Sequence, residues 1–228
     1  MLEELKAKVC KANLLLKEYN LVLHTWGNVS ERDKETGYIV IKPSGVSYEN
    51  MKPSDMVVVD INGNIIEGDL KPSSDTKTHL EIYKKFNNIN GVAHTHSLYA
   101  TSWAQSGADV IPLGTTHADY FYGSIKCTRA LTKEEVNGDY EKNTGLVITE
   151  YIDDPKAVPG ILVFNHGPFT WGSDSIDAAK NASYLEYVCN LAYNTININS
   201  KVESISKSIL DKHYFRKHGP NAYYGQKD

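Results

Sequence analysis

The sequence of 228 residues contains little cysteine and no long apolar run. Its three cysteines, Cys10, Cys127 and Cys189, lie far apart and never form a CxxC pair, so neither a disulfide framework nor a structural zinc knuckle is indicated. No stretch approaches the roughly 18 apolar residues of a membrane span. The N-terminal segment carries charges throughout, which excludes a signal peptide. We therefore expect a soluble, cytoplasmic protein with reduced thiols.

A basic excess is also missing. The formal net charge is −4, whereas general nucleic-acid binders usually carry a surplus of lysine and arginine. We expect no nucleic-acid or membrane partner, although this charge does not exclude a local basic site for a small anion. The length suffices for one domain with its own core, and no repeat, low-complexity tract or linker interrupts the chain. We expect a single domain over residues 1–228.

Apolar spacing and turn residues predict alternating helices and short strands. Helices are expected over 2–18, 76–86, 98–105, 173–193 and 202–214, and strands over 38–41, 56–60, 64–67, 145–148, 161–164 and around the histidines of 91–97. Residues 27–30 have the composition of a polar turn, and Gly167-Pro168 is expected to stop the strand before it. Ser74 or Asp75 could cap the second helix. Because the strands come in hairpin-like pairs, the fold class is predicted as α/β, with a central, mainly antiparallel sheet flanked by helices.

Two histidines spaced i, i+2 suggest half of a metal site. On an extended strand His94 and His96 would share a face about 7 Å apart, too far for direct contact but suited to converge on one ion. His166 follows the strand 161–164, and three neutral imidazoles with an open fourth position are typical of a catalytic zinc site. Asp75 could add a carboxylate oxygen or orient a ligand histidine. Taken singly, the histidine pair and His166 are better explained as ordinary strand or turn residues.

Three small-residue loops could bind a phosphate group. They contain Gly27 and Asn28, Ser44 and Gly45, and Ser73 and Ser74, whose hydroxyl, amide or backbone N–H groups could form an anion-binding concavity. A helix beginning near Thr76 would assist through its N-terminal dipole, and Lys42 supplies a candidate counter-charge. No P-loop pattern is present, so nucleotide binding is not supported. Each loop alone is also compatible with an ordinary turn.

Together these motifs resemble the zinc-dependent class II aldolase family nearly end to end. The HxH pair with a distant histidine is shared across the family, whereas the TTHADYFYG block and the AYYGQ tail are specific to its epimerase branch. The matching segments are LHTWGNVS (23–30), IKPSGV (41–46), KPSSDT (71–76), HTHS (94–97), GTTHADYFYG (114–123), NHGPF (165–169), LDKHYFRKHG (210–219) and AYYGQ (222–226). Residues 138–160 and 194–206 match poorly, and we expect them to be surface segments away from the chemistry.

The resemblance implies a site shared between subunits. One Zn²⁺ per subunit would be held by His94, His96 and His166, with Asp75 on or beside the metal, and the three loops with Lys42 would contact a sugar phosphate. The assembly implied is a C4-symmetric homotetramer with active sites between neighbouring subunits. Asp119 and Tyr224 of the neighbouring subunit would carry protons, with His213 in support, and Asp119 would act best with a pKa raised by burial. Histidine and carboxylate ligands accept zinc, manganese or cobalt.

The activity implied is the interconversion of L-ribulose 5-phosphate and D-xylulose 5-phosphate. The hydrogen on C4 of a ketose is not acidic, so inversion would proceed by breaking and remaking the C3–C4 bond, with the metal acting as a Lewis acid. Aldolases of the family that release products carry Glu where this chain has Asp75, which favours an epimerase. The alternatives are a sugar-phosphate aldolase and a non-catalytic module on the same fold; a zinc hydrolase lacks its HExxH motif. Whether the substrate derives from arabinose, ascorbate or xylulose is left open by the sequence.

Overall fold

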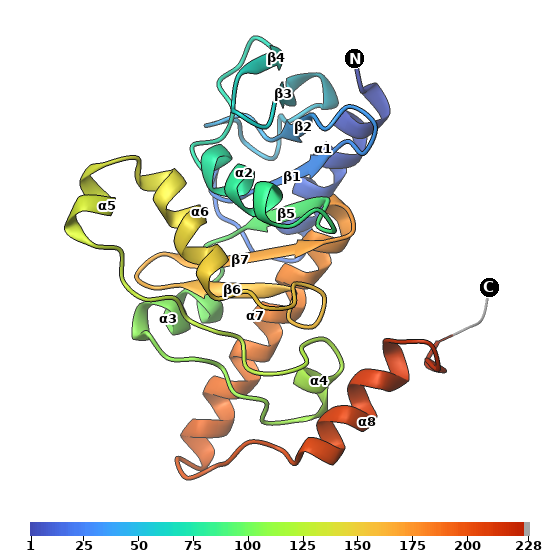
Figure 1. Cartoon of the computed structure of the whole chain (residues 1–228), viewed down its shortest axis with the longest axis vertical. Coiled ribbons are helices and arrows are strands. Elements are labelled where there is room, and N and C mark those ends of the chain that lie inside the picture. Colours follow the sequence, from blue (N-terminus) through green and yellow to red (C-terminus); the bar gives the residue numbers. More distant parts are fainter. Residues whose placement is uncertain (226–228) are drawn as a thin grey trace.

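A computed structural model describes residues 1–225 as one α/β unit around a seven-stranded sheet (Figure 1). Every strand pairing is antiparallel, and the strand order is β4-β3-β2-β1-β5-β7-β6. The strands are β1 (Asn28–Arg32), β2 (Ile39–Ile41), β3 (Val57–Val59), β4 (Ile65–Glu67), β5 (Gly91–His94), β6 (Gly160–Val163) and β7 (Gly167–Gly172). The helices are α1 (Glu3–Glu18), α2 (Thr76–Lys85), α3 (Leu98–Ser106), α4 (Thr115–Ala118), α5 (Lys133–Asn137), α6 (Tyr140–Glu150), α7 (Ser175–Ile198) and α8 (Lys207–Lys217), with a 3₁₀ turn η1 (Pro53–Asp55).

Helices cover both faces of the sheet, which explains why inner strands such as β3 and β5 are apolar at consecutive positions. In β3, Val57 and Val59 face a core that includes residues of α2 and α6, while Val58 packs with residues of α1. In β5, Val92 belongs to the α2–α6 side and Ala93 to the side covered by α1 and α7. Side chains alternate across a strand, so a sheet buried on both faces loses the usual apolar–polar alternation. β5 lies between β1 and β7 in the interior of the sheet, and its residues are buried on both faces (Figure 1).

Most of the predicted elements are confirmed. The mainly antiparallel sheet flanked by helices is present, and the helices predicted over 2–18, 76–86 and 98–105 match α1, α2 and α3 within about two residues. The long helix is capped by Asp174, whose side chain accepts from the backbone N–H of Asp177, and it continues through the asparagine-rich stretch to Ile198. The last helix begins at Lys207, later than predicted. Asp75 precedes α2, but its side chain forms no capping hydrogen bond.

Three predictions of local structure were wrong. Residues 27–30, predicted as a turn, open β1, whose polar residues Asn28 and Ser30 are buried at the centre of the sheet. Residues 145–148, predicted as a strand, lie within α6, because a short apolar run does not distinguish a buried strand from a helix. Gly167-Pro168 does not end a strand but begins β7; Pro168 is tolerated there because it lies next to the strand's first residue.

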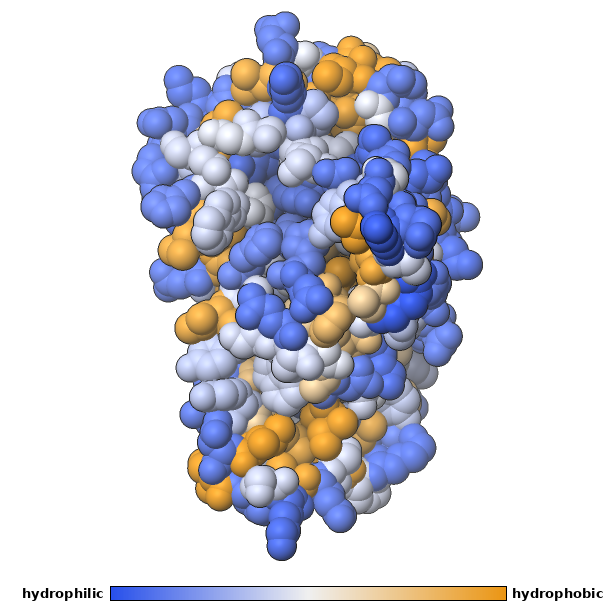
Figure 2. Space-filling view, turned by 90° about the vertical axis from the view of Figure 1, so that its left-hand side faces the viewer, coloured by the Kyte–Doolittle hydropathy of each residue, from blue (hydrophilic) through white to orange (hydrophobic). Residues whose placement is uncertain are grey.

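The outer surface is mostly hydrophilic on the face shown in Figure 2, with hydrophobic side chains gathered near its lower end, at the level of the C-terminal part of α7. Exposed apolar residues of that helix include Tyr187, Leu191, Tyr193 and Ile198. In the described part of the chain, no helix combines the length and apolar composition needed to cross a membrane.

Candidate metal centre and anion pocket

His94 is the best-anchored member of a cluster of three histidines. It is the last residue of β5, in register with Asn28 of β1 and Phe169 of β7. Its ring stacks on that of Phe169, with centroids 4.2 Å apart and planes at 17°. Its Nδ1 lies 2.9 Å from the carbonyl oxygen of Pro168, and because a carbonyl only accepts, Nδ1 must donate. The lone pair of Nε2 is therefore free for a metal ion.

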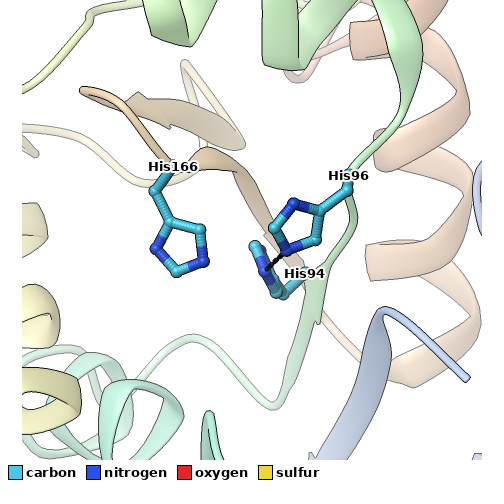
Figure 3. Close-up of side chains that lie close together, drawn as sticks. All are labelled: His94, His96 and His166. Atoms are coloured by element: carbon cyan, nitrogen blue, oxygen red, sulfur yellow. Dashed lines mark hydrogen bonds between the residues drawn. The ribbon is translucent and has the colours of Figure 1, made fainter.

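His96 and His166 bring their rings to the same point. Figure 3 shows the Nε2 atoms of His94 and His96 facing each other, and they lie 3.1 Å apart. His96 lies beyond the end of β5, and the prediction that the two histidines are too far apart for direct contact was wrong. His166 comes from the turn between β6 and β7, and one donor atom from each of the three histidines lies within 4.8 Å of the others. Two nitrogens bound tetrahedrally to one zinc ion would be about 3.3 Å apart, so the histidines fit a metal after small ring movements.

The surroundings keep these imidazoles in the form that binds metals. Burial, followed by the proximity of His94, lowers the pKa of His166 to about 3. Burial and then His94 likewise lower the pKa of His96. Since a protonated imidazole cannot ligate a cation, depressed pKa values leave both lone pairs available at neutral pH. The donor set of three neutral nitrogens is compatible with a divalent transition metal such as Zn²⁺.

Asp75 lies beside the cluster rather than within the group of converging donor atoms. Its Oδ2 accepts a hydrogen bond of 2.6 Å from the amide of Asn28. Burial alone would raise the pKa of the Asp75 carboxyl, but the proximity of His94 and His79 and the hydrogen bond from the Asn28 amide hold it below its ordinary value. With its N–H donor engaged in this way, Asn28 presents its Oδ1, which is buried and has no partner within residues 1–225.

All the predicted phosphate-binding residues line one cavity of about 410 Å³ together with His96 and His166. Gly45 adopts the left-handed φ of 71°, and a side chain there would meet open space, so the backbone at this turn is accessible from the cavity. The wall also carries five residues that were not predicted from the sequence. The lining residues are Thr25, Trp26, Gly27, Asn28, Lys42, Pro43, Ser44, Gly45, Ser73, Ser74, Asp75, His96, Tyr140, Glu141 and His166.

Lys42 gives this cavity a positive charge that no carboxylate neutralises within the described residues. Its side chain is 1% exposed and its ammonium group donates to the carbonyl oxygens of Thr25 (3.2 Å) and Pro43 (3.4 Å). Across residues 1–225 no carboxylate forms an ion pair with it. Burial lowers the pKa of Lys42 to about 8, so the group is still mostly charged at neutral pH. A buried cation facing hydroxyl and backbone groups is suited to an anionic ligand.

The lining residues that were not predicted are Thr25, Trp26, Pro43, Tyr140 and Glu141. Trp26 is half-exposed, with its ring 6.0 Å from that of His96. Tyr140 and Glu141 begin α6 inside the segment 138–160, which was predicted to lie away from the chemistry; that prediction was wrong. No local sequence signal identifies Tyr140 and Glu141 as cavity residues, because it is the packing of α6 on α2 that brings them to the cavity.

Asp119 forms a second polar cluster with α8. It follows α4, is 9% exposed, and pairs through both carboxylate oxygens with Arg216 at 2.9–3.2 Å. His213 Nδ1 lies 3.0 Å from Asp119 Oδ1, and the Lys217 ammonium is 3.3 Å from Oδ2. Burial acts to raise the pKa of Asp119, but Arg216, His213 and Lys217 lower it below its ordinary value. The expectation of a raised pKa was therefore wrong for this chain on its own.

Tyr224 lies against the same cluster and is 61% exposed. The guanidinium carbon of Arg216 is 5.1 Å from its ring centre, and the ammonium of Lys217 is 4.3 Å away. Neither Asp119 nor Tyr224 lines the histidine cavity of the same chain. The structure therefore places the two expected proton carriers against the same basic residues and apart from the histidine cavity of the same chain. Gln226, the last residue of the AYYGQ motif, lies outside the described residues.

Comparison with known proteins identifies a family and related folds. The sequence pattern of the class II aldolase and adducin N-terminal domain matches residues 7–193. Among solved structures, an L-fuculose 1-phosphate aldolase superposes with a TM-score of 0.79 at 25% identity, covering 93% of this chain and 95% of that one. YgbL from Klebsiella pneumoniae, described as a putative aldolase/epimerase/decarboxylase, gives 0.76 at 22% identity and covers 93% and 99%. L-fuculose 1-phosphate aldolase from Glaciozyma antarctica PI12 gives 0.77 at 17% identity and covers 96% and 84%.

Proposed function

Because the chain belongs to the class II aldolase and adducin N-terminal domain family, we propose that it is a metal-dependent sugar-phosphate enzyme, L-ribulose-5-phosphate 4-epimerase. The observation that carries this proposal is one cavity in which converging histidine donors face a buried lysine and hydroxyl-bearing loops. Such a cavity suits a ligand with metal-binding oxygens at one end and a phosphate at the other. We assign the whole chain, residues 1–228, to this one cytoplasmic enzyme.

The reaction requires stabilisation of a carbanion rather than abstraction of a proton from C4. Cleaving the C3–C4 bond of L-ribulose 5-phosphate gives the enediolate of dihydroxyacetone and glycolaldehyde phosphate. A bound Zn²⁺ ion would supply Lewis-acid stabilisation to the enediolate oxygens. If the aldehyde then turns its other face to the enediolate, the new C3–C4 bond yields D-xylulose 5-phosphate. Each direction moves one proton off and one proton onto the C4 oxygen, so atoms and charge balance.

The residues of the cavity divide this work. Lys42 and the loops holding Ser44 and Ser73 would retain the phosphate of the aldehyde fragment, which prevents its release while it turns. Asp75 is held by Asn28 at 2.6 Å, so its carboxylate is better placed to orient a metal ligand than to reach a reacting oxygen. Proton transfer on the two faces is assigned to Asp119 and Tyr224 of a neighbouring subunit in a homotetramer.

A sugar-phosphate aldolase is the second candidate. The similarity to an L-fuculose 1-phosphate aldolase over nearly the whole of both chains favours it. The two activities differ in the fate of the fragments, since an aldolase releases them and an epimerase rejoins them. The aspartate at position 75, in place of the glutamate of the family's aldolases, favours the epimerase.

One assay separates the candidates. The purified protein is loaded with zinc and incubated with L-ribulose 5-phosphate, and D-xylulose 5-phosphate and free glycolaldehyde phosphate are measured together. Inversion without release is expected; release without inversion, or cleavage of L-fuculose 1-phosphate only, identifies an aldolase. Activity that survives complete chelation would refute the metal-dependent mechanism.

The shared site has its own test. His94→Ala and Asp119→Asn subunits, each inactive alone, are unfolded together and refolded as a mixture. In a cyclic tetramer, about a quarter of the interfaces in an equal mixture would pair an intact metal centre with an intact Asp119. Recovery of about a quarter of the wild-type activity is expected, and no recovery from a properly assembled mixture would contradict a site between subunits.

A further inference from the structure

Tyr140 is placed between the metal centre and the cavity. It is the first residue of α6 and lines the cavity wall. Its hydroxyl lies 3.4 Å from His166 Nδ1, at the long end of hydrogen-bonding range, and the two rings are 6.2 Å apart at 27°. The other ring nitrogen of His166 points toward His94 and His96 in Figure 3. The two nitrogens of His166 therefore have different neighbours.

The protonation of one nitrogen determines the use of the other. For Nε2 of His166 to offer a lone pair to a metal ion, the imidazole proton must reside on Nδ1, which then donates to the Tyr140 hydroxyl. A tyrosine hydroxyl has a single proton, so a hydroxyl that accepts from His166 keeps that proton for a partner in the cavity. We propose that Tyr140 is a positioning residue that holds His166 in its metal-binding tautomer and, through its own O–H, donates a hydrogen bond to an oxygen atom of the bound substrate.

The backbone around Tyr140 is held firmly enough for this role. Gly145 lets α6 approach α2 closely: a Cβ there would lie 2.7 Å from the Cβ of Glu81 and 2.9 Å from the carbonyl oxygen of Thr78. The Thr78 hydroxyl donates to the backbone carbonyl of Glu141 at 2.7 Å, which fixes the residue next to Tyr140. The start of α6 is therefore fixed against α2 in a region remote in sequence.

His94 and His166 are oriented by groups of different kinds. His94 Nδ1 donates to a backbone carbonyl in the core, which no ligand can reach. His166 Nδ1 faces a side-chain hydroxyl that also lines the cavity. A ligand oxygen that accepts from Tyr140 polarises its hydroxyl and strengthens its acceptance from His166. Substrate binding and the third metal ligand are thereby coupled through one oxygen atom.

The positioning role is tested without turnover. Zinc affinity is measured by chelator competition for the wild type, Tyr140→Phe and the control Tyr99→Phe, which removes a half-buried hydroxyl on α3 outside the cavity. Tyr140→Phe is expected to bind zinc about tenfold more weakly, with the control unchanged. In the apo-protein, ¹⁵N NMR should place the His166 proton on Nδ1, and this preference should fall in Tyr140→Phe. Unchanged affinity and tautomer in Tyr140→Phe would overturn the inference.

The donation to substrate rests on the proposed function and has a separate readout. At zinc concentrations that saturate both proteins, Tyr140→Phe should raise KM or lower kcat for the sugar phosphate about tenfold, while its affinity for inorganic phosphate stays that of the wild type. If Tyr140→Phe has the kcat and KM of the wild type under zinc saturation, the hydrogen bond to substrate is refuted and the positioning of His166 is not. A wild-type protein that binds zinc but converts no sugar phosphate would refute the proposed function and leave the positioning role standing.

Discussion

Replacing Lys42 with methionine should make the protein more stable at neutral pH and unable to bind phosphate. Burial lowers the pKa of Lys42 from 10.5 to about 8, a difference of about 2.5 that corresponds to about 3 kcal/mol for keeping the group charged in the folded protein. Methionine has a similar length and no charge, but it loses two long hydrogen bonds to carbonyl oxygens, at about 1 kcal/mol each. A net gain of about 1 kcal/mol at pH 7 is expected.

The pH dependence gives this prediction its sign. Between pH 8 and pH 10.5 the unfolded chain keeps the Lys42 proton and the folded protein has lost it, so the stability of the wild type rises with pH. From pH 7 to pH 10 this one group adds about 2.5 kcal/mol to the free energy of unfolding of the wild type. The free energy of unfolding of Lys42→Met lacks this increase, so the wild type should become the more stable protein above about pH 9.

Urea denaturation of both proteins, at the same protein concentration and from pH 7 to pH 10, measures the difference in their free energies of unfolding. All other titrating groups contribute equally to the two proteins and cancel in this difference. A difference in stability that stays constant over this range would refute the assigned burial of the charge. Inorganic phosphate provides a second arm: it should raise the midpoint for the wild type at pH 7 and leave that of Lys42→Met unchanged. A shift of equal size in both would remove Lys42 from the anion site.

The other predictions concern the metal, the choice of reaction and the packing of α6. His94→Ala should lose zinc binding, so that zinc in large excess over its dissociation constant, which should stabilise the wild type by about 4 kcal/mol, no longer raises its Tm; a persisting rise would place the metal elsewhere. Asp75→Glu should increase the release of glycolaldehyde phosphate relative to inversion, since the added methylene extends the carboxylate from a residue that lines the cavity; an unchanged product ratio would contradict this. Gly145→Ala should destabilise the protein by about 2 kcal/mol in urea titration, because α6 must move off α2, and equal stability would show that the contact is loose.

The sequence predicted the architecture better than the centre of the sheet. Apolar strands such as β3 and the amphipathic α1 follow simple periodicity. β1 does not, because the partners of its buried polar residues are distant in sequence: Ser30 bonds to His79 and Tyr83 at 2.8 Å each. Since a polar residue in a strand is normally exposed, only the folded neighbours reveal why these residues are buried.

The candidate site was predictable where each of its residues belongs to a short sequence motif. The three histidines and the serine and glycine loops meet in one region, as the family resemblance implied. Tyr140 was missed because its position depends on Gly145, where a missing side chain allows two helices to approach. The pKa of Asp119 was misjudged because burial was considered without Arg216, whose guanidinium outweighs it. Both errors concern contacts between residues far apart in the chain.

The unequal support of the three histidines bears on how quickly a metal ion could be exchanged. β5, which carries His94, is hydrogen-bonded on both sides by β1 and β7, and such central strands open only when the whole protein unfolds. His166 lies in a turn whose Asn165 has a φ of 59°, and its imidazole is held by a single side chain. The Tyr140 hydroxyl is the hydrogen-bond partner of the His166 imidazole, so we expect a bound ion to leave when this side chain turns away, while β5 and His94 stay in place. The apo-protein would then persist as a folded, reloadable species.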